Sequence, residues 1–258
     1  MFIDVDNYNI YYEILGDKNP QFDCLLIHGW GTDLYSLRLT SNILSKKYRV
    51  YSIDLPGFGK SDKLKESFTV DDYTNIVIHF IEKIGIKNVC LVGHSYGGRI
   101  IIKMNNRPNL PFNIKQNVLI DSAGIKHKQK NSMRTYTYKF LKKLYMFLPI
   151  SIEAKEKKID ELKKRFGSID YRNADGVLRD TLVKSVNEDL SEEIKNIKAK
   201  TLIIWGDKDT ATPISDAKYL NENIKDSELH IINGAGHFPF VDSPFKYEDI
   251  LKKFYDIK

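Results

Sequence analysis

The chain has 258 residues, of which 42% are hydrophobic and 29% are charged. This length and composition are typical of one globular domain, with or without an insertion, and exclude a disordered or low-complexity protein. The formal net charge is +6, but residues 126–165 hold thirteen Lys or Arg and four Asp or Glu, which leaves 27 basic and 30 acidic residues elsewhere. Because the basic excess belongs to one segment, the sequence argues against a nucleic-acid-binding protein with a basic body.

The sequence gives no sign of a membrane or secretory protein. The opening residues, MFIDVDNYNIYYEILGD, contain neither a basic start nor an apolar run, so we expect no signal peptide. No stretch reaches the length that spans a bilayer. Cys24 and Cys90 lie inside apolar runs, which favours buried, reduced thiols and a cytoplasmic location. No group of His and Cys has zinc-ligand spacing, so we expect no metal and no other cofactor.

Short apolar runs recur along the chain, and several end in glycine or aspartate. They cover residues 9–15, 24–29, 49–55, 88–93, 117–122, 200–206 and 228–233. Several runs are continuous rather than alternating, as in strands that are buried on both faces of a sheet. Helical patterns alternate with them, including residues 69–85, which open with a Thr-x-x-Asp cap, and residues 243–255, which open with Ser-Pro. This alternation predicts an α/β fold with a mostly parallel sheet and helices on both faces.

One long interval, residues 123–196, contains no convincing strand. The helical patterns within it cover residues 133–148, 152–165 and 174–187. The interval leaves the carboxyl end of a strand, which is the edge of an α/β sheet where ligands bind. We therefore expect a core made of residues 1–122 and 197–258, with residues 123–196 forming a helical cap over the site.

The stretch LVGHSYGG at residues 91–98 places Ser95 between an apolar strand run and a helical run. In this context Gly93-x-Ser95-x-Gly97 is typical of a nucleophile elbow, a tight turn that holds the serine in a strained backbone conformation. Both glycines are needed because side chains there would collide across the turn. We therefore predict that Ser95 is a nucleophile; a merely structural glycine-rich turn is the alternative.

A serine nucleophile needs a base and an acid that orients the base. Among the histidines, only His237 lies in a loop that follows a strand run and precedes a capped helix. Asp209 is the expected acid because it lies far enough into the preceding strand's loop to reach His237 Nδ1. Asp121, at the end of an earlier strand run, is the second choice, and Asp207, which is closer to its strand, is the third.

The negative charge that develops during acyl transfer needs two backbone N–H donors. One is expected from Tyr96, which directly follows the nucleophile. The other is expected from Trp30 in the His-Gly-Trp-Gly loop after an early strand run, and its side chain would then form a wall of the pocket.

These motifs make the chain resemble α/β-hydrolase fold proteins that carry a helical cap. HGWG, DLPGFGKSD, GHSYGG, WGDKD and GAGHFPF occur in the family's order, and together they cover nearly the whole chain except the cap. The resemblance implies a sheet of about eight strands with the cap inserted after the sixth, and a nucleophile, acid and base in the order found here. Epoxide hydrolases and haloalkane dehalogenases of this fold have aspartate at the position of Ser95, so the serine indicates acyl chemistry.

The leading expectation is a serine hydrolase that cleaves small carboxylic esters through an acyl-enzyme. One alternative is a carbon–carbon bond hydrolase of ring-cleavage products, with Arg165, Arg172 or Arg179 of the cap binding an acidic substrate. A cofactor-free perhydrolase is another, while the complete set of Ser, Asp and His disfavours a non-catalytic ligand receptor. The sequence leaves the physiological substrate and the oligomeric state open.

The cap pattern also predicts how the pocket is walled. Residues 134–149 have a broad apolar face, and part of it is expected to line a tunnel for an apolar acyl chain. We expect Trp30, Phe140 and Phe238 to form that wall. The basic residues of the cap predict weak contact with anionic lipid surfaces, without integral membrane association.

Overall fold

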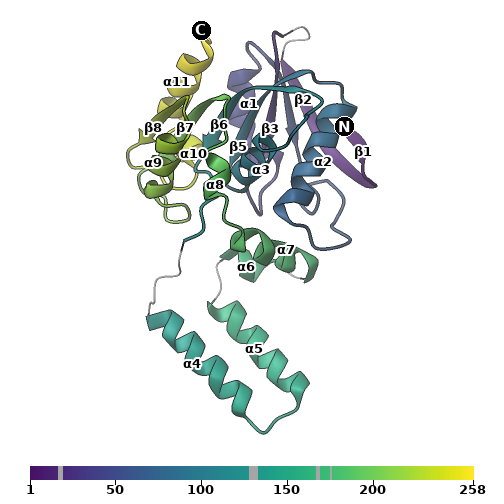
Figure 1. Ribbon diagram of the computed structural model, residues 1–258, viewed down its shortest axis with the longest axis vertical. Coiled ribbons are helices and arrows are strands. Elements are labelled where there is room, and N and C mark those ends of the chain that lie inside the picture. The colour runs from purple at the N-terminus through teal and green to yellow at the C-terminus, as the bar shows by residue number, and fades with distance from the viewer. Residues whose placement is uncertain (17–19, 128–132, 167–168, 175) are drawn as a thin grey trace.

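The computed structural model describes residues 1–16, 20–127, 133–166, 169–174 and 176–258. In this part of the chain an eight-stranded sheet has the order β1-β2-β4-β3-β5-β6-β7-β8 (Figure 1). The first two pairings of that order are antiparallel and all the others are parallel, as the alternation of runs predicts. The strands are β1 (Phe2–Val5), β2 (Tyr8–Gly16), β3 (Asp23–Ile27), β4 (Arg49–Ile53), β5 (Asn88–His94), β6 (Asn113–Ile120), β7 (Lys200–Gly206) and β8 (Ser227–Ile232).

Helices cover both faces of the sheet, which explains why the central strands have continuous apolar runs. They are η1 (Leu34–Leu37), α1 (Arg38–Leu44), α2 (Val70–Lys83), α3 (Tyr96–Asn105), α9 (Ile214–Asn223), α10 (Pro239–Asp242) and α11 (Pro244–Tyr255). Successive side chains of a strand point to opposite faces. In β5, Leu91 packs into the core formed with α2 and α3, whereas Val92 packs into the core formed with α1 and α11, and both are fully buried.

Helix α2 begins at the predicted cap. The Thr69 hydroxyl accepts a hydrogen bond from the Asp72 backbone N–H at 3.2 Å, and the Asp72 carboxylate accepts one from the Thr69 N–H at 2.7 Å. These reciprocal bonds satisfy two backbone donors that the first turn of a helix leaves free. They fix the point at which the helix starts, and therefore the face that it buries against the sheet.

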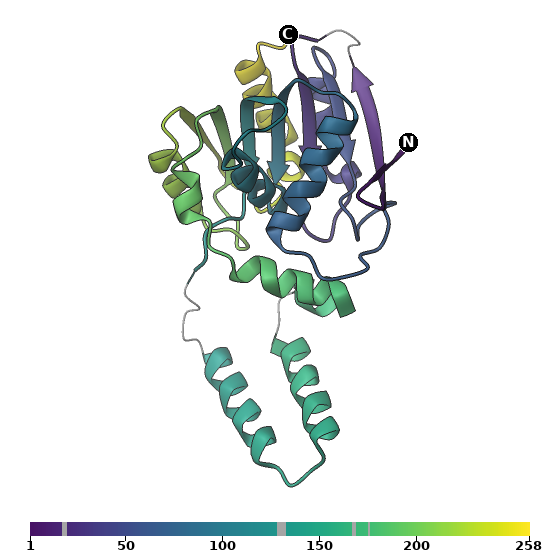
Figure 2. The ribbon, with the colours of Figure 1, turned by 45° about the vertical axis from the view of Figure 1, so that its right-hand side comes forward.

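The segment between β6 and β7 forms helices in two parts. Its helices are α4 (Met133–Phe147), α5 (Ile152–Phe166), α6 (Ile169–Asn173), α7 (Gly176–Asn187) and α8 (Ser191–Ile194). Helices α4 and α5 pack against each other as a hairpin that projects away from the sheet (Figures 1 and 2). Helices α6 and α7 lie between this hairpin and the core (Figure 1). The hairpin α4–α5 is therefore distinct from the part of the segment that covers the sheet edge.

Helix α7 of this segment is held against the core by hydrogen bonds and burial. The hydroxyls of Tyr96 and Ser185 lie 2.9 Å apart, and the Phe68 N–H donates to the Thr181 hydroxyl at 3.0 Å. Thr181 and Ser185 are fully buried, and Leu182 between them is 5% exposed. These contacts place α7 over the turn that begins α3.

Cys24 and Cys90 are buried, free thiols on neighbouring strands, in register between β3 and β5. This agrees with the expectation from the apolar runs around them. Among the helices of the described residues, none combines the length and the apolar character needed to cross a bilayer.

Candidate active site

Ser95 lies at the turn between β5 and α3 with φ +50° and ψ −108°. A positive φ is strained for a residue with a side chain and persists only where the surroundings hold it. Here the Ser95 N–H donates to the Ile120 carbonyl at 3.0 Å, and its carbonyl accepts from the N–H groups of Gly98 and Ala123 at 3.0 and 2.9 Å. The turn is therefore fixed from β6 as well as from its own helix.

The glycines that flank Ser95 have no room for a side chain. A Cβ atom on Gly97 would lie 2.2 Å from the Ile27 carbonyl oxygen, and one on Gly93 would lie 2.7 Å from the backbone of Gly97. Both neighbours are backbone atoms of buried elements and have little freedom to move. This close packing of strand against helix is the steric requirement that the Gly-x-Ser-x-Gly pattern predicts.

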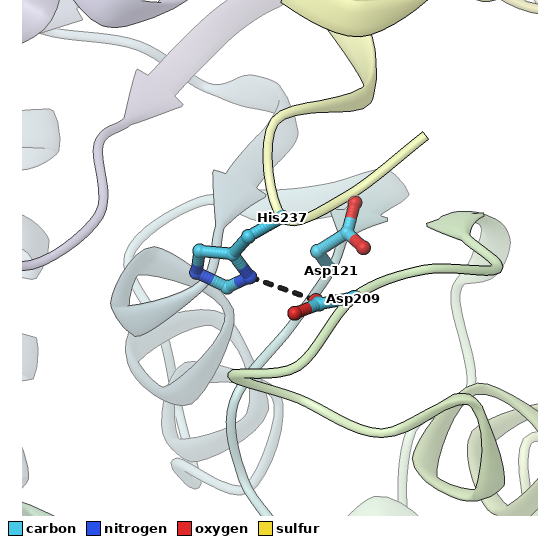
Figure 3. Close-up of side chains that lie close together, drawn as sticks. All are labelled: Asp121, Asp209 and His237. Carbon is cyan, nitrogen blue, oxygen red and sulfur yellow. Dashed lines mark hydrogen bonds and ion pairs between the residues drawn. The ribbon is translucent and has the colours of Figure 1, made fainter. Parts of the chain in front are cut away.

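His237 and Asp209 lie beside Ser95 although each comes from a different loop. His237 Nε2 is 2.9 Å from Ser95 Oγ. On the other side of the ring, His237 Nδ1 is 2.8 Å from Asp209 Oδ2, as Figure 3 shows. Asp209 follows β7 and His237 follows β8, so both loops emerge at the carboxyl edge of the parallel sheet, beside the elbow after β5. With Nδ1 donating to the carboxylate, Nε2 is left to accept the proton of the serine hydroxyl.

The Asp209 carboxylate is held in its ionised form. Burial raises its pKa, but hydrogen bonds from His237 and from the Thr212 hydroxyl outweigh burial, so the pKa of Asp209 lies well below its ordinary value. Its Oδ1 also accepts from the N–H groups of Ala211 and Thr212 at 2.7 and 3.1 Å. A carboxylate fixed in this way stabilises an imidazolium at His237.

Asp121, the second choice for the acid, lies beside Asp209 (Figure 3). Its Oδ1 accepts from the Gly206 N–H at 3.0 Å, and its Oδ2 is buried without a hydrogen-bond partner among the described residues. Burial and the adjacent Asp209 charge raise the pKa of Asp121 to about 9, so it is neutral at pH 7. The carboxylate that meets His237 is thus that of Asp209. Asp207, the third choice, accepts from the Gly234 N–H at 2.6 Å and supports a turn.

Asp121, Asp209 and His237 also lie close enough to one another to share a cation, with one ligand atom from each within 4.8 Å. A metal at His237 Nδ1 would require that nitrogen without its proton, whereas here it donates to Asp209. The hydrogen-bonded arrangement therefore fits an acid–base group better than a metal site.

Trp30 and Tyr96, whose backbone N–H groups are the expected oxyanion donors, both line the cavity that contains Ser95. His28 supports the Trp30 loop, because its Nε2 accepts from the Leu55 N–H at 3.0 Å and its Nδ1 donates to the Gly29 carbonyl at 2.7 Å. Burial lowers the pKa of His28, which keeps the ring neutral for these two roles.

His94 supports the loop that carries His237, as His28 supports the Trp30 loop. Its Nε2 donates to the His237 carbonyl at 2.7 Å, and its ring packs beside that of His237. Burial lowers the pKa of His94 to about 3, with a smaller contribution from the neighbouring His237, so this ring remains neutral. The sequence marks His28 and His94 only as neighbours of motif glycines and gives no sign of these positioning roles.

A cavity of about 860 Å³ opens at Ser95. The core contributes Trp30 and Phe238 to its lining, and helix α7 contributes Leu182 and Val186. The expectation that Phe140 lines this cavity is wrong: Phe140 lies on the projecting α4 and is 68% exposed.

The physical reason is the position of the hairpin. Helix α7 occupies the place over the elbow that was expected for α4, and the contacts of α4 are with α5. Tyr138 on α4, for example, packs against Phe166 of α5 with ring centroids 5.9 Å apart.

Comparisons with known proteins agree with this fold. The model of the Alpha/beta hydrolase family matches residues 24–250. The chain is 28% identical to the uncharacterized hydrolase YugF of Bacillus subtilis (strain 168), over 90% of this chain and 89% of that protein. It is 27% identical to the pimeloyl-[acyl-carrier protein] methyl ester esterase of Wigglesworthia glossinidia brevipalpis, over 95% and 96% of the two chains.

The solved structure of a membrane phospholipase A, described as a novel bacterial virulence factor, is similar with a TM-score of 0.74 and 25% identity. The match covers 99% of this chain and 85% of that one. The family model spans most of the sequence, from β3 to α11, and includes the elbow and both loops that meet it. The chain therefore belongs to the alpha/beta hydrolase family.

Proposed function

We propose that this protein is a serine hydrolase that cleaves carboxylic esters through an acyl-enzyme on Ser95. The observation that carries the proposal is the hydrogen-bonded line from Ser95 Oγ through His237 to Asp209, which begins at a strained turn. Serine hydroxyls are weak nucleophiles unless a base within hydrogen-bond reach accepts the proton, and this arrangement provides such a base with an acid to orient it. The methyl ester esterase among the relatives supports ester cleavage as the reaction.

In the first half-reaction, His237 Nε2 takes the Ser95 proton as Oγ attacks the carbonyl carbon of the ester. The N–H groups of Trp30 and Tyr96 stabilise the charge on the carbonyl oxygen, and Asp209 stabilises the imidazolium. His237 then donates the proton to the leaving oxygen, which departs as an alcohol. In the second half, water attacks the acyl-enzyme with the same base, releasing the carboxylic acid and restoring Ser95.

The test is Ser95→Ala assayed on p-nitrophenyl esters from acetate to palmitate. We expect kcat to fall by about 10⁴ or more, because the residue that forms the covalent intermediate is lost. A fluorophosphonate probe should label the wild-type protein and not the variant. Ser191→Ala on α8, outside the cavity lining, is the matched control and should keep both properties. Near-normal turnover by folded Ser95→Ala would exclude the serine mechanism.

The carbon–carbon bond hydrolase is distinguished in the same assay by adding a vinylogous 1,5-diketone. The cap arginines suggested for an acidic substrate do not favour this reaction, since Arg165, Arg172 and Arg179 are absent from the described cavity lining. Arg179 instead donates to the Ala174 carbonyl at 2.7 Å and pairs with Asp160 at 3.3 Å. Faster turnover of the diketone than of every ester would replace ester cleavage with carbon–carbon cleavage.

A further inference from the structure

Arg99 is a buried cation in the wall of the cavity that contains Ser95. It lies on α3 one helical turn after the elbow, a rise of about 6 Å along the helix axis, and is 5% exposed. A guanidinium carries five N–H donors, and burying its charge is costly unless it is paired. Within the described part of the chain, Arg99 donates only to the Glu188 carbonyl, at 2.9 Å, and no carboxylate oxygen lies within 4.0 Å of it.

The nearest acidic side chains are already engaged with other groups. The Glu188 carboxylate pairs with Lys103 at 2.5 Å, so only its backbone carbonyl meets Arg99. Asp189 accepts from the Ser191 hydroxyl at 2.6 Å and from the Lys126 N–H at 3.2 Å. Burial lowers the pKa of Arg99, the direction expected for a cation whose surroundings only partly compensate its charge.

The cavity that contains Arg99 holds two further basic groups and two acids. Lys126 and His127 line the same cavity, and the Lys126 ammonium donates to the Asn187 carbonyl at 2.8 Å. One acid is Asp216, which is 3% exposed and lies 2.8 Å from His127 Nε2. The other is Asp170, from α6. The cavity lining thus holds three basic side chains and two carboxylates, one of which is already paired with His127.

We propose that Arg99 binds a carboxylate carried by the acyl part of the substrate, so that the preferred substrates are hemiesters of short dicarboxylic acids. The planar guanidinium matches a carboxylate with two parallel N–H···O bonds. One helical turn between Ser95 and Arg99 suits a short chain between the two carboxyl carbons, and Leu182 and Val186 provide apolar wall for its methylene groups. Hydrolysis then consumes the hemiester anion and water and releases an alcohol, the dicarboxylate and a proton.

This inference rests on the proposed ester hydrolysis. The first experiment compares kcat/KM for an ester that carries a second carboxylate with kcat/KM for a neutral ester. Wild-type enzyme is assayed in a pH-stat on monomethyl glutarate and on methyl pentanoate, which has a chain of equal length without the second carboxylate. We expect the ratio of kcat/KM for the hemiester to that for the neutral ester to fall about 10- to 100-fold in Arg99→Met, mainly through KM, as a charge-assisted hydrogen bond is lost. Arg99→Lys should recover part of the ratio.

Arg38→Met is the matched control, because it makes the same substitution at an arginine of α1 that pairs with Glu13 at 3.0 Å and lies outside the cavity lining. This substitution should leave the ratio unchanged. Equal losses on both esters in Arg99→Met would mean that Arg99 only fastens α3 to the Glu188 carbonyl, and the proposal would be wrong. Monomethyl succinate and monomethyl adipate, run beside glutarate, identify the preferred chain length.

A second experiment needs no turnover. Ser95→Ala protein is titrated with glutarate and, as the neutral comparison, with glutaramide, by isothermal calorimetry. We expect glutarate to bind at least 10-fold more tightly than glutaramide, and Ser95→Ala/Arg99→Met to lose that preference. Equal binding of the two compounds, or a preference that survives without Arg99, would overturn the carboxylate site. If the wild-type enzyme cleaves no ester while glutarate still binds through Arg99, the proposed reaction fails and the carboxylate site stands.

Discussion

At the scale of single residues, two neighbouring carboxyl groups have opposite protonation states. Asp209 and Asp121 lie within one small cluster with His237, yet hydrogen bonds from His237 and Thr212 keep Asp209 ionised, whereas burial keeps Asp121 neutral. A pair whose environments separate the two pKa values in this way usually divides the acid–base tasks. Only the ionised partner can stabilise an imidazolium, so the two residues should respond differently to substitution.

Asp209→Asn should lower kcat on p-nitrophenyl esters by about 10³- to 10⁴-fold, because the amide favours the wrong tautomer of His237. Asp121→Asn should lower it less than about tenfold, because an amide resembles the neutral carboxyl that it replaces. The comparison of the two kcat values, at equal protein concentration and pH, is the measurement. A larger loss for Asp121→Asn would show that Asp121 orients the base.

The raised pKa of Asp121 also predicts a pH dependence of stability. An unfolded aspartate releases its proton near pH 4, while the folded one holds it to about pH 9, so the free energy of unfolding falls as the pH rises between these values. Asp209, whose pKa is lowered on folding, contributes in the opposite sense but only below about pH 4.

Asp121→Asn removes the Asp121 contribution. We therefore expect the thermal midpoint of the variant to rise relative to that of the wild type as the pH is increased from 5 to 9. Parallel melting curves at every pH would mean that Asp121 titrates normally in the folded protein.

At the scale of elements, the turn between β5 and α3 depends on contact between backbones. Gly97→Ala should destabilise the fold by more than about 3 kcal/mol or prevent folding, because its Cβ would overlap the Ile27 carbonyl of β3. Gly85→Ala is the comparison: no atom lies within 4 Å of its Cβ position, but its φ of +79° leaves a cost of about 1 kcal/mol. Urea unfolding of both variants measures the two losses of stability, and we expect the larger loss in Gly97→Ala.

The hairpin α4–α5 presents apolar side chains at its far end. Met146, Phe147 and Ile152 are 54%, 77% and 75% exposed. Lysines on both helices surround this end: Lys142, Lys143, Lys155, Lys157 and Lys158. An apolar tip with basic flanks suits the surface of an anionic bilayer, where the aromatic ring enters the interface and the lysines meet lipid headgroups. The weak lipid contact predicted from the basic cap is thus expected at this tip.

The measurement is co-sedimentation with phosphatidylcholine vesicles with and without phosphatidylserine. We expect binding only when phosphatidylserine is present, weaker binding in high salt, and a severalfold loss in Phe147→Ser. Phe245→Ser is the matched control, since Phe245 is 86% exposed and belongs to α11, which lies at the opposite end of the molecule from the hairpin in Figure 1. If the two substitutions weakened vesicle binding equally, the tip of the hairpin would not be the lipid contact.

At the scale of the whole molecule, the sequence predicts the features that depend on local pattern. Buried strands, their glycine and aspartate ends, and the loops with Asp209 and His237 follow from apolar runs and breakers. The sequence does not predict strand β1, because this strand is four residues long and mostly accessible, with no continuous apolar run. Phe140 shows a different limit: helical periodicity identifies an apolar face but does not identify the element against which that face packs.

The sequence does not predict the burial of Arg99, for a related reason. Nothing in the run RIIIKM distinguishes a solvated arginine from one buried against the segment that follows α7. Its burial arises from segments that are distant in sequence, through contacts such as the one with the Glu188 carbonyl. The elbow, in contrast, is encoded within a few consecutive residues, and it can be recognised before the fold is known.

The cap enters and leaves the core at two adjacent parallel strands, since β6 and β7 pair in register up to Ile120 and Ile204. Ser95, Asp209 and His237 all lie outside the inserted segment. The insertion can therefore be exchanged, lengthened or shortened during evolution while Ser95, Asp209 and His237 keep their positions. If Arg99 sets the charge preference, the arginine itself would be inherited with the core, while its contact with Glu188 and the apolar wall from α7 would vary with each new insertion.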